Sequence, residues 1–167
     1  MKIKIKKLNE NAKTPVKSKA GDFCYDVWAT SCEEVAPNVY KYGIGLAFEI
    51  VRDNEIIEQY NKTSCSETKC IDLKNSPICL DIDFRPRSSV WKTGMVLCNC
   101  EGTIDEGDRN QVFAFFYHVM PNMPKYEVGD RIGQIKIGFT TPIEFEIVDE
   151  LDMDTERGLS GFGSTGK

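Results

Sequence analysis

The 167-residue sequence lacks the features that mark several common classes of protein. No stretch approaches the roughly 18 consecutive apolar residues of a membrane-spanning helix. The N-terminal stretch MKIKIKKLNENAK is basic, but it has no apolar core of the kind found in a secretory signal peptide. Positive charge is not in excess either, because the net charge is −5 and the pI about 5.0. We therefore expect a cytoplasmic protein with no membrane partner and no nucleic-acid partner, although a few local arginines would suffice to bind a small anion.

Residues that commonly bind metals are few or badly spaced. The sequence has one histidine, His118, and seven cysteines. An odd number of cysteines in a cytoplasmic protein indicates reduced thiols. None of their spacings gives the C-x2-C pair that is typical of structural zinc sites. We expect thiols buried or half-buried in the core, and a zinc site that includes Cys65, Cys70 and Cys79 is the alternative.

Helical periodicity is scarce, and Asn54–Lys62 alone could form one or two helical turns. Many short segments instead alternate apolar and polar residues, are rich in Val, Ile and aromatics, and are bounded by turn residues. These strand candidates are Lys2–Leu8, Gly43–Ile50, Cys79–Phe84, Gly94–Cys100, Gln111–Val119, Arg131–Ile137 and Ile143–Val148. Many short strands separated by turn signals predict an all-β sandwich or barrel.

The length favours a single domain, because domains typically hold about 100–200 residues. We expect a β-domain over residues 1–150. The stretch 52–77 is polar and weakly patterned, which indicates a variable insertion in that domain. The apolar pattern stops near Leu151, so residues 151–167 form a C-terminal arm in this interpretation.

The arm ends in RGLSGFGSTGK, with four glycines among the last ten residues. Gly161 and the pair Gly166-Lys167 match the start of a P-loop pattern, but the Ser/Thr that completes the pattern is missing. A floppy terminus is the ordinary alternative. However, an Arg fork, hydroxyls and accessible backbone N–H groups suit a triphosphate, and an aromatic face suits a base. With Arg157 and Phe162 present, we interpret the arm as a lid over a nucleotide.

Two segments offer charged groups for such a ligand. In GDFCYDVWA, Asp26 lies within an apolar, aromatic run and needs a partner, because an unpaired buried carboxylate is unfavourable. Asp26 either caps a turn at a strand end or holds a hydrated Mg²⁺. In RPRSS, Arg87 with Ser88 and Ser89 forms either an anion site or an ordinary surface loop.

Two further segments place polar residues at strand ends. In NCEGTIDEGDR, a strand runs into a hairpin at Gly102, and a tight hairpin can present backbone groups to a base. Asp105 lies where this hairpin begins, and an aspartate in an ordinary β-turn is the alternative. In GDRIGQIKI, Gln134 is a polar residue within an apolar strand, either facing outward or binding a ligand.

In chain order, the segments YDVWA, PRSSVWKTG, NCEGTIDEGDR, GDRIGQIKI and RGLSGFGSTG resemble the five motifs of the trimeric dUTP pyrophosphatase (dUTPase) family. The similarity spans residues 2–167, with 52–77 inserted before the second motif. This resemblance implies a distorted jelly-roll β-barrel and a homotrimer with active sites between subunits. It implies hydrolysis of dUTP to dUMP and pyrophosphate, which lowers dUTP and supplies dUMP for dTMP synthesis. It also implies that the arm of one chain closes over a site formed by others.

The resemblance also implies a role for each motif residue. Asp105 would orient and deprotonate the water that attacks the α-phosphorus. Mg²⁺ would bind the three phosphates, with Asp26 touching the waters of the metal. The hairpin residues that would read the uracil edge are Asn99, Gly102, Thr103 and Ile104. The residues that would contact the phosphates are Arg87, Ser88, Ser89 and Gln134. The arm would supply Arg157, Gly163, Ser164 and Thr165 to the triphosphate and Phe162 to stack on the uracil.

One motif position departs from the family pattern, because Asp108 stands where the third motif usually has a tyrosine under the deoxyribose. This change predicts weaker rejection of ribose. Two other functions are alternatives: a non-catalytic, regulatory nucleotide-binding member of the same fold, and a relative of dCTP deaminase. The GTID hairpin and the GFGSTG tail favour the pyrophosphatase.

Overall fold

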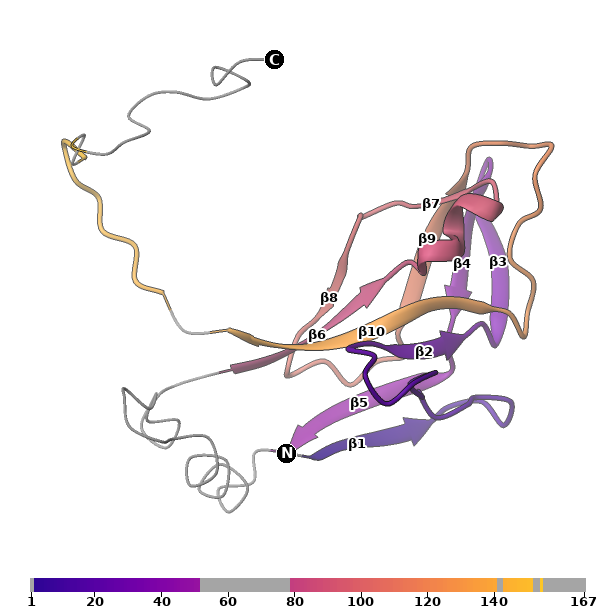
Figure 1. Cartoon of the computed structure of the whole chain (residues 1–167), viewed down its shortest axis with the longest axis horizontal. Helices are drawn as coiled ribbons and strands as arrows, with labels where there is room; N and C mark the ends of the chain where they lie inside the picture. The colour runs from indigo at the N-terminus through magenta and orange to yellow at the C-terminus, as the bar shows by residue number, and fades with distance from the viewer. Residues whose placement is uncertain (1, 52–78, 141–142, 152–153, 155–167) are drawn as a thin grey trace.

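The computed structural model describes residues 2–51, 79–140, 143–151 and 154, and this part of the chain consists of β-strands, turns and one 3-10 helix (Figure 1). The strands are β1 (Lys2–Lys7), β2 (Tyr25–Trp28), β3 (Ser31–Ala36), β4 (Val39–Gly43), β5 (Leu46–Val51), β6 (Cys79–Arg85), β7 (Met95–Leu97), β8 (Gly102–Ile104), β9 (Phe113–His118) and β10 (Arg131–Thr140). The 3-10 helix η1 covers Ser88–Lys92. Across these ranges, no helix has the length and apolar character needed to cross a membrane. The all-β prediction is confirmed.

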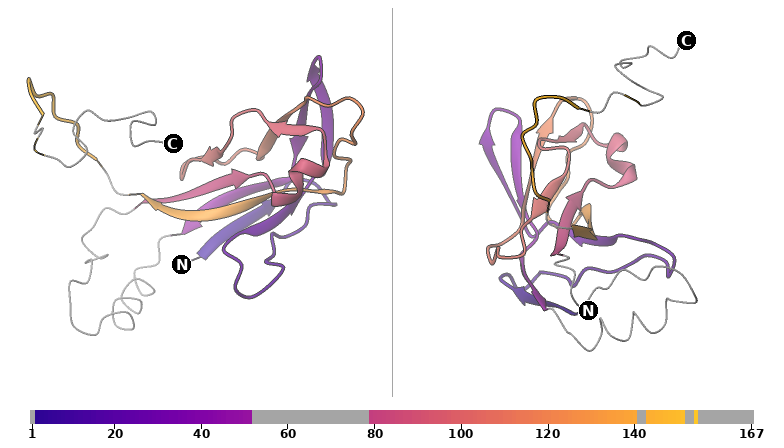
Figure 2. Two further views of the ribbon diagram at one scale, coloured as in Figure 1. Left: turned by 45° about the horizontal axis from the view of Figure 1, so that its top comes forward. Right: turned by 90° about the vertical axis from the view of Figure 1, so that its left-hand side faces the viewer.

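The strands form three antiparallel sheets. Strands β1 and β5 pair as a two-stranded sheet, and the two four-stranded sheets have the orders β2-β10-β6-β8 and β3-β4-β9-β7. Figures 1 and 2 show β10 lying alongside both β2 and β6. The central position of β10 brings together segments from the first, second and fourth motif regions of the sequence.

The core forms because apolar side chains alternate along the strands with a period of two. In β9, Ala114 and Phe116 are buried, while the neighbouring residues are more exposed. The Phe116 ring makes edge-to-face contacts with Tyr42, Phe84 and Tyr126, at centroid distances of 5.8, 6.4 and 5.4 Å. Such contacts add to the free energy gained from burying the rings. This aromatic cluster joins β4, β6 and β9 and fixes the sheets against each other.

In β10, the backbone of Gly133 lies close to the ring of Phe84. A Cβ atom added at Gly133 would lie 2.1 Å from Cζ of Phe84, so the ring packs directly on the glycine backbone. The register shifts between Arg131 and Gly133 in the β2–β10 pairing, which indicates a bulge or irregularity. Beyond it, Gln134 lies opposite both Asp26 of β2 and Arg85 of β6.

Most strand predictions are confirmed with shifted ends, but one is wrong. Residues 143–148 carry the expected alternation, yet they form no strand in the structure. Their apolar side chains are exposed, with Phe145 at 89% and Ile147 at 100% of full exposure. A strand requires a hydrogen-bonded neighbour, and none of the described strands pairs with this segment. The predicted helical turns at Asn54–Lys62 and the predicted insertion at 52–77 lie outside the described residues.

Candidate active site

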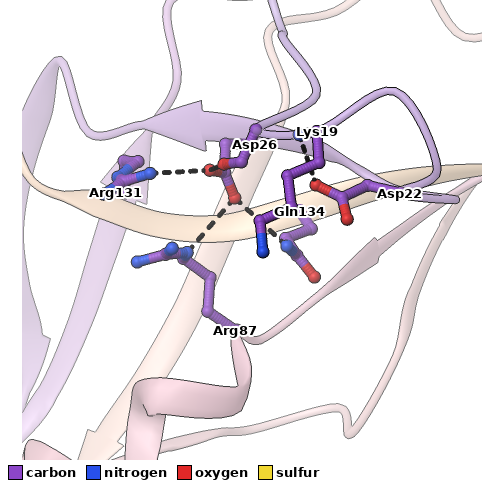
Figure 3. A network of polar contacts seen from close by, with 7 residues as sticks. Lys19, Asp22, Asp26, Arg87, Arg131 and Gln134 are labelled. Atoms are coloured by element: carbon purple, nitrogen blue, oxygen red, sulfur yellow. Dashed lines mark hydrogen bonds and ion pairs between the residues drawn. The ribbon is translucent and has the colours of Figure 1, made fainter.

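The carboxylate of Asp26 is the centre of a polar cluster (Figure 3). Asp26 lies on β2 and is 2% exposed. Its Oδ1 accepts hydrogen bonds from Nε of Arg87 at 3.2 Å and from Nε2 of Gln134 at 3.1 Å. Its Oδ2 accepts hydrogen bonds from Oγ of Ser18 at 3.0 Å and from Nη1 of Arg131 at 2.9 Å. The cluster therefore joins three segments that are far apart in the sequence.

Backbone pairing places these side chains. The backbone of Asp26 bridges Val16 on one side, which brings Ser18 close, and pairs with Gln134 on the other. The turn before β10 contains Gly129 with φ +97, a conformation that favours glycine and that leads the chain into Arg131. Strand β6 ends at Arg85, and Arg87 follows at the start of η1.

The cluster has a net positive charge. Burial alone would raise the pKa of Asp26. Hydrogen bonds from Gln134, Arg131 and Ser18, together with the charge of Arg87, outweigh burial and hold the pKa below its ordinary value. Asp26 is therefore ionised at neutral pH, and two guanidinium groups surround one carboxylate. The guanidinium-bearing side chains remain 24% exposed for Arg87 and 44% exposed for Arg131. A partly exposed arrangement of this sign suits an anionic ligand.

The hydroxyls of the second motif lie beside this cluster in sequence. Ser88 and Ser89 open η1, directly after Arg87, whose carbonyl accepts a hydrogen bond from Val90 N at 2.9 Å. Ser88 is exposed and Ser89 is half-buried. Both residues therefore retain exposed surface at the end of β6.

The predicted hairpin begins with β8, which pairs with β6. A Cβ atom added at Gly102 would lie 3.2 Å from Nδ2 of Asn99, so this amide packs over the bare glycine backbone. Thr103 donates its hydroxyl to Oδ1 of Asp83 at 2.9 Å, which secures the strand. Asp105 follows β8 and is exposed, and its carbonyl accepts a hydrogen bond from Asp108 N at 2.9 Å. Asn99, Gly102 and Thr103 are therefore held together at one end of the hairpin.

Within one chain, Asp105 lies away from the Asp26 cluster. Gly102 pairs with Phe84, and Ile104 pairs with Ile82, so β8 runs away from the end of β6 that leads to Arg87. Ile82 and Arg85 are three positions apart, which corresponds to roughly 10 Å along a strand. The chain runs on in the same direction after Ile104, so Asp105 lies farther still from Arg85. A single chain therefore does not bring the predicted base and the predicted phosphate-binding groups into one site.

Comparison with known proteins gives the family. No protein-family model matches the chain. The curated deoxyuridine 5'-triphosphate nucleotidohydrolase of Nautilia profundicola is 31% identical over 169 residues, which cover 100% of both chains. The enzyme of the same name from Wolinella succinogenes is 29% identical and covers 100% of this chain and 95% of its own. The chain belongs to the dUTPase family.

Solved structures agree with this dUTPase assignment at the level of the fold. A mutant dUTPase of Staphylococcus bacteriophage 80alpha, solved with dUpNHpp, matches with a TM-score of 0.70 at 19% identity and covers 99% of both chains. The dUTPase of phage phi11 of S. aureus matches with a TM-score of 0.62 at 16% identity, over 91% of this chain and 99% of that one. The predicted fold is therefore confirmed as that of the dUTPases.

The dUTPase motifs differ in how far the structure describes them. Residues of the first, second and fourth motifs meet around Asp26, whereas the third motif forms the separate hairpin. The predicted arm residues Arg157, Phe162, Gly163, Ser164 and Thr165 lie outside the described residues. Sequence reasoning missed Arg131 and Ser18 as partners of Asp26. Arg131 stands within the quoted fourth motif, but a basic residue at a strand start gives no separate signal.

The structure also describes Asp108, which stands where the third motif of the family usually has a tyrosine. Oδ1 of Asp108 accepts hydrogen bonds from the backbone N and from Nδ2 of Asn110, at 2.8 and 2.9 Å. One carboxylate oxygen is thus used by a local turn. The other oxygen keeps its capacity to accept a hydrogen bond.

Around Asp26, the described residues offer a metal ion one carboxylate. No group of three or more His, Cys, Asp or Glu side chains that could hold a metal occurs among the residues that the structure describes. Asp26 is a single carboxylate, and both of its oxygens already accept hydrogen bonds. Mg²⁺ commonly binds through one or two carboxylates, waters and substrate phosphates rather than in an all-protein cage. One carboxylate of this kind could contact a hydrated Mg²⁺ through water, but it does not form a protein cage for the ion.

Proposed function

We propose that this protein hydrolyses dUTP to dUMP and pyrophosphate in the cytoplasm, which lowers dUTP and supplies dUMP for dTMP synthesis. The observation that carries this proposal is the Asp26 cluster, in which residues at three dUTPase motif positions meet as a partly exposed cationic site. The full-length similarity to curated dUTPases adds support.

The reaction is an in-line attack of water on the α-phosphorus. Asp105 orients the water and accepts its proton, and its exposed position after β8 leaves the carboxylate accessible to a ligand. Arg87, Ser88, Ser89 and Gln134 bind the phosphate chain. Positioning and charge stabilisation of this kind account for most of the catalysis of phosphoryl transfer.

The third-motif hairpin selects the base. Asn99 and the backbone of Gly102, Thr103 and Ile104 hydrogen-bond the uracil edge. The packing of the Asn99 amide on Gly102 supports this role, because the polar groups are held close together before a ligand binds. Thymine is rejected by its methyl group and cytosine by its reversed donors, since a snug polar site discriminates strongly against unpaired groups.

Mg²⁺ belongs to this reaction as a ligand of the three phosphates. Asp26 contacts the hydrated ion through water. When bound, the ion neutralises charge on the phosphate chain and restricts its geometry. The single carboxylate among cationic neighbours supports an ion that is bound mainly by substrate.

The active unit is a homotrimer with active sites between subunits. The separation of Asp105 from the Asp26 cluster within one chain supports a site completed by another copy. Exposed apolar surface gives further support, since large patches mark interfaces. One patch is the segment 143–151, where Ile143 and Phe145 are 69% and 89% exposed. Another is an open cleft between β1, β5 and β10 that contains Ile3, Phe23 and Ile137.

The arm, residues 151–167, closes over the site of a neighbouring copy. Arg157, Gly163, Ser164 and Thr165 contact the triphosphate, and Phe162 stacks on the uracil. Glycine lets the arm lie close to the phosphates, and ordering of the arm is offset by charge-assisted hydrogen bonds.

Incubation with dUTP, UTP, dCTP and dTTP, followed by separation of the products, tests the function. Release of dUMP and pyrophosphate from dUTP is the expected result. Binding without turnover would instead favour a regulatory nucleotide-binding protein. Formation of dUTP from dCTP would favour a deaminase.

Mixing of inactive variants tests the shared site. Arg87→Gln and Asp105→Asn chains are each expected to be inactive alone. If sites form between subunits, co-refolded mixtures regain part of the activity, because some sites receive both wild-type residues. No recovery in mixed trimers that are verified by mass would show that each site belongs to one chain.

A further inference from the structure

The two oxygens of the Asp26 carboxylate have different kinds of partner (Figure 3). Oδ1 accepts hydrogen bonds from Arg87 and Gln134, which the proposed function assigns to the phosphates. Oδ2 accepts hydrogen bonds from Ser18 and Arg131, which have no role in that proposal. Asp26 thus connects a ligand-binding side to a side that contacts only the carboxylate.

The hydrogen bonds to Oδ1 orient the side chains of Arg87 and Gln134 and leave some of their N–H donors available for phosphate. Arg87 donates through Nε, and a guanidinium has five N–H donors, so four remain for a ligand. Gln134 donates through Nε2, which carries a second hydrogen. Each side chain is therefore fixed by one hydrogen bond and can present its other donors to a phosphate oxygen.

The contacts on Oδ2 determine whether this geometry persists. A carboxylate with one cationic neighbour favours a bidentate pair with both ends of the guanidinium fork. If Arg131 were absent, Arg87 would be the main cation available to the buried Asp26 and would turn its fork toward it. Arg131, at 2.9 Å, provides a second cation and leaves the Arg87 fork available.

We infer that Arg131 is a positioning residue for triphosphate binding: with Ser18 it compensates and orients the buried Asp26 carboxylate, which in turn holds Arg87 and Gln134 ready for phosphate. Asp26 then acts on binding through these two side chains, in addition to the water-mediated contact with Mg²⁺ in the proposed function. The inference rests on the proposed function, because it takes the phosphate-binding roles of Arg87 and Gln134 from there.

A double-mutant cycle on Asp26 and Arg131 tests the inference. The affinity of the full-length protein for dUpNHpp, an imido analogue of dUTP, is measured by calorimetry with Mg²⁺ present. Arg131→Gln should weaken binding about 10–100-fold, the range expected for loss of one or two charge-assisted hydrogen bonds. In the Asp26→Asn background, the same change should weaken binding less than about threefold, because coupled residues are non-additive.

Four controls sharpen the cycle. Lys136→Gln removes a positive charge from the same strand as Arg131. Asp22→Asn removes a carboxylate that accepts a hydrogen bond from Lys19 N at 2.8 Å, within its own turn. Both should bind the analogue nearly as the wild type does. Binding of dUMP, which lacks two phosphates, should change several-fold less than binding of the analogue in Arg131→Gln. The half-saturating Mg²⁺ concentration should remain unchanged in that variant.

Several results would overturn the inference. An equal loss from Arg131→Gln in both backgrounds would show that Arg131 contacts the phosphates directly. No loss in the wild-type background would show that Arg131 is dispensable. A shift in the Mg²⁺ requirement with unchanged affinity in Asp26→Asn would show that Asp26 acts on the metal and not on the phosphate-binding side chains. If Asp26→Asn does not fold, Arg87→Gln replaces it in the cycle, because the inference has Arg131 act on binding through the Asp26 contact with Arg87, and an equal loss in both backgrounds again contradicts the inference.

The test remains separate from the test of the proposed function. If the wild type binds the analogue but leaves dUTP intact, the catalytic proposal fails and the cycle still reports on positioning. If the wild type hydrolyses dUTP and the cycle is additive, only the role of Arg131 is wrong.

Discussion

The Asp26 cluster and the third-motif hairpin are built in opposite ways. In the cluster, the buried carboxylate of Asp26 contacts residues that lie 61, 105 and 108 positions away from it in the sequence. The hairpin turn is held by hydrogen bonds between residues close in the sequence, such as the one from Asn110 N to Asp108, two positions away. Most of its residues are exposed. The side that the proposed function assigns to the phosphates is therefore ordered by the fold of one chain. In the same proposal, the side assigned to the base and to catalysis is completed by another copy.

The largest expected effect lies on the hairpin. Asp105→Asn should retain nucleotide binding while turnover falls about 10²–10⁴-fold, the usual range for loss of a general base. Steady-state rates and the affinity for dUpNHpp, measured together, check this. Glu106→Gln, which changes the charge of the same turn, is the matched control and should stay active. Near-normal turnover in Asp105→Asn would remove this residue from the mechanism.

A smaller effect is expected from the arm, which both regions need in the proposed function. Deletion of residues 157–167 should leave a folded trimer and lower turnover roughly 10–100-fold, through the loss of charge-assisted contacts to phosphate. Light scattering and circular dichroism follow the assembly while product release is assayed. Aggregation or unfolding of the shortened chain would show instead that the arm is structural.

Ribose selectivity should change less. Asp108→Tyr should raise the ratio of kcat/KM for dUTP over UTP by about tenfold, since an aromatic floor excludes a 2'-hydroxyl and one hydrogen bond to a charged acceptor is lost, a difference of about 1.5 kcal/mol. The effect is modest because one oxygen of Asp108 already accepts hydrogen bonds from Asn110. Rates with both nucleotides give the ratio. An unchanged ratio in the tyrosine variant would mean that another residue supplies the floor.

The smallest effect concerns stability in acid and belongs to the cluster. The pKa of Asp26 is lowered in the folded state, so its contribution to the free energy of unfolding is present above the ordinary value of 3.8. The contribution is lost as the pH falls below that value through the folded pKa. Urea unfolding between pH 3 and 7 should therefore show the difference between wild type and Asp26→Asn shrinking in acid. A pH-independent difference would mean that the charge of Asp26 does not stabilise the fold.

Much of the fold follows from local patterns. Alternation and bounding turn residues predict β1, β6, β9 and β10, because a half-buried strand must alternate. The alternation misses β3 (Ser31–Ala36), whose residues are mostly exposed and polar. The alternation also predicts a strand at residues 143–148, which is wrong, because none of the described strands pairs with this segment.

The candidate site is predictable only in part. Asp26, Arg87 and Gln134 stand out because each departs locally from its surroundings. The role of Arg131 is not visible in the sequence, since it depends on the β2–β10 register, which pairs residues more than one hundred positions apart. A basic residue that opens a strand is ordinary until its partner across the sheet is known.

The pairing of β2 with β10 also sets the order in which the molecule can mature during synthesis. The Asp26 carboxylate leaves the ribosome more than one hundred residues before Arg131 and Gln134. Contacts of such high sequence separation slow folding, and nascent segments that lack their partners are prone to aggregate. We therefore expect the anion-binding cluster to form late, after β10 has been synthesised, so that chains arrested before residue 131 expose β2 and β6 to chaperones and bind no nucleotide.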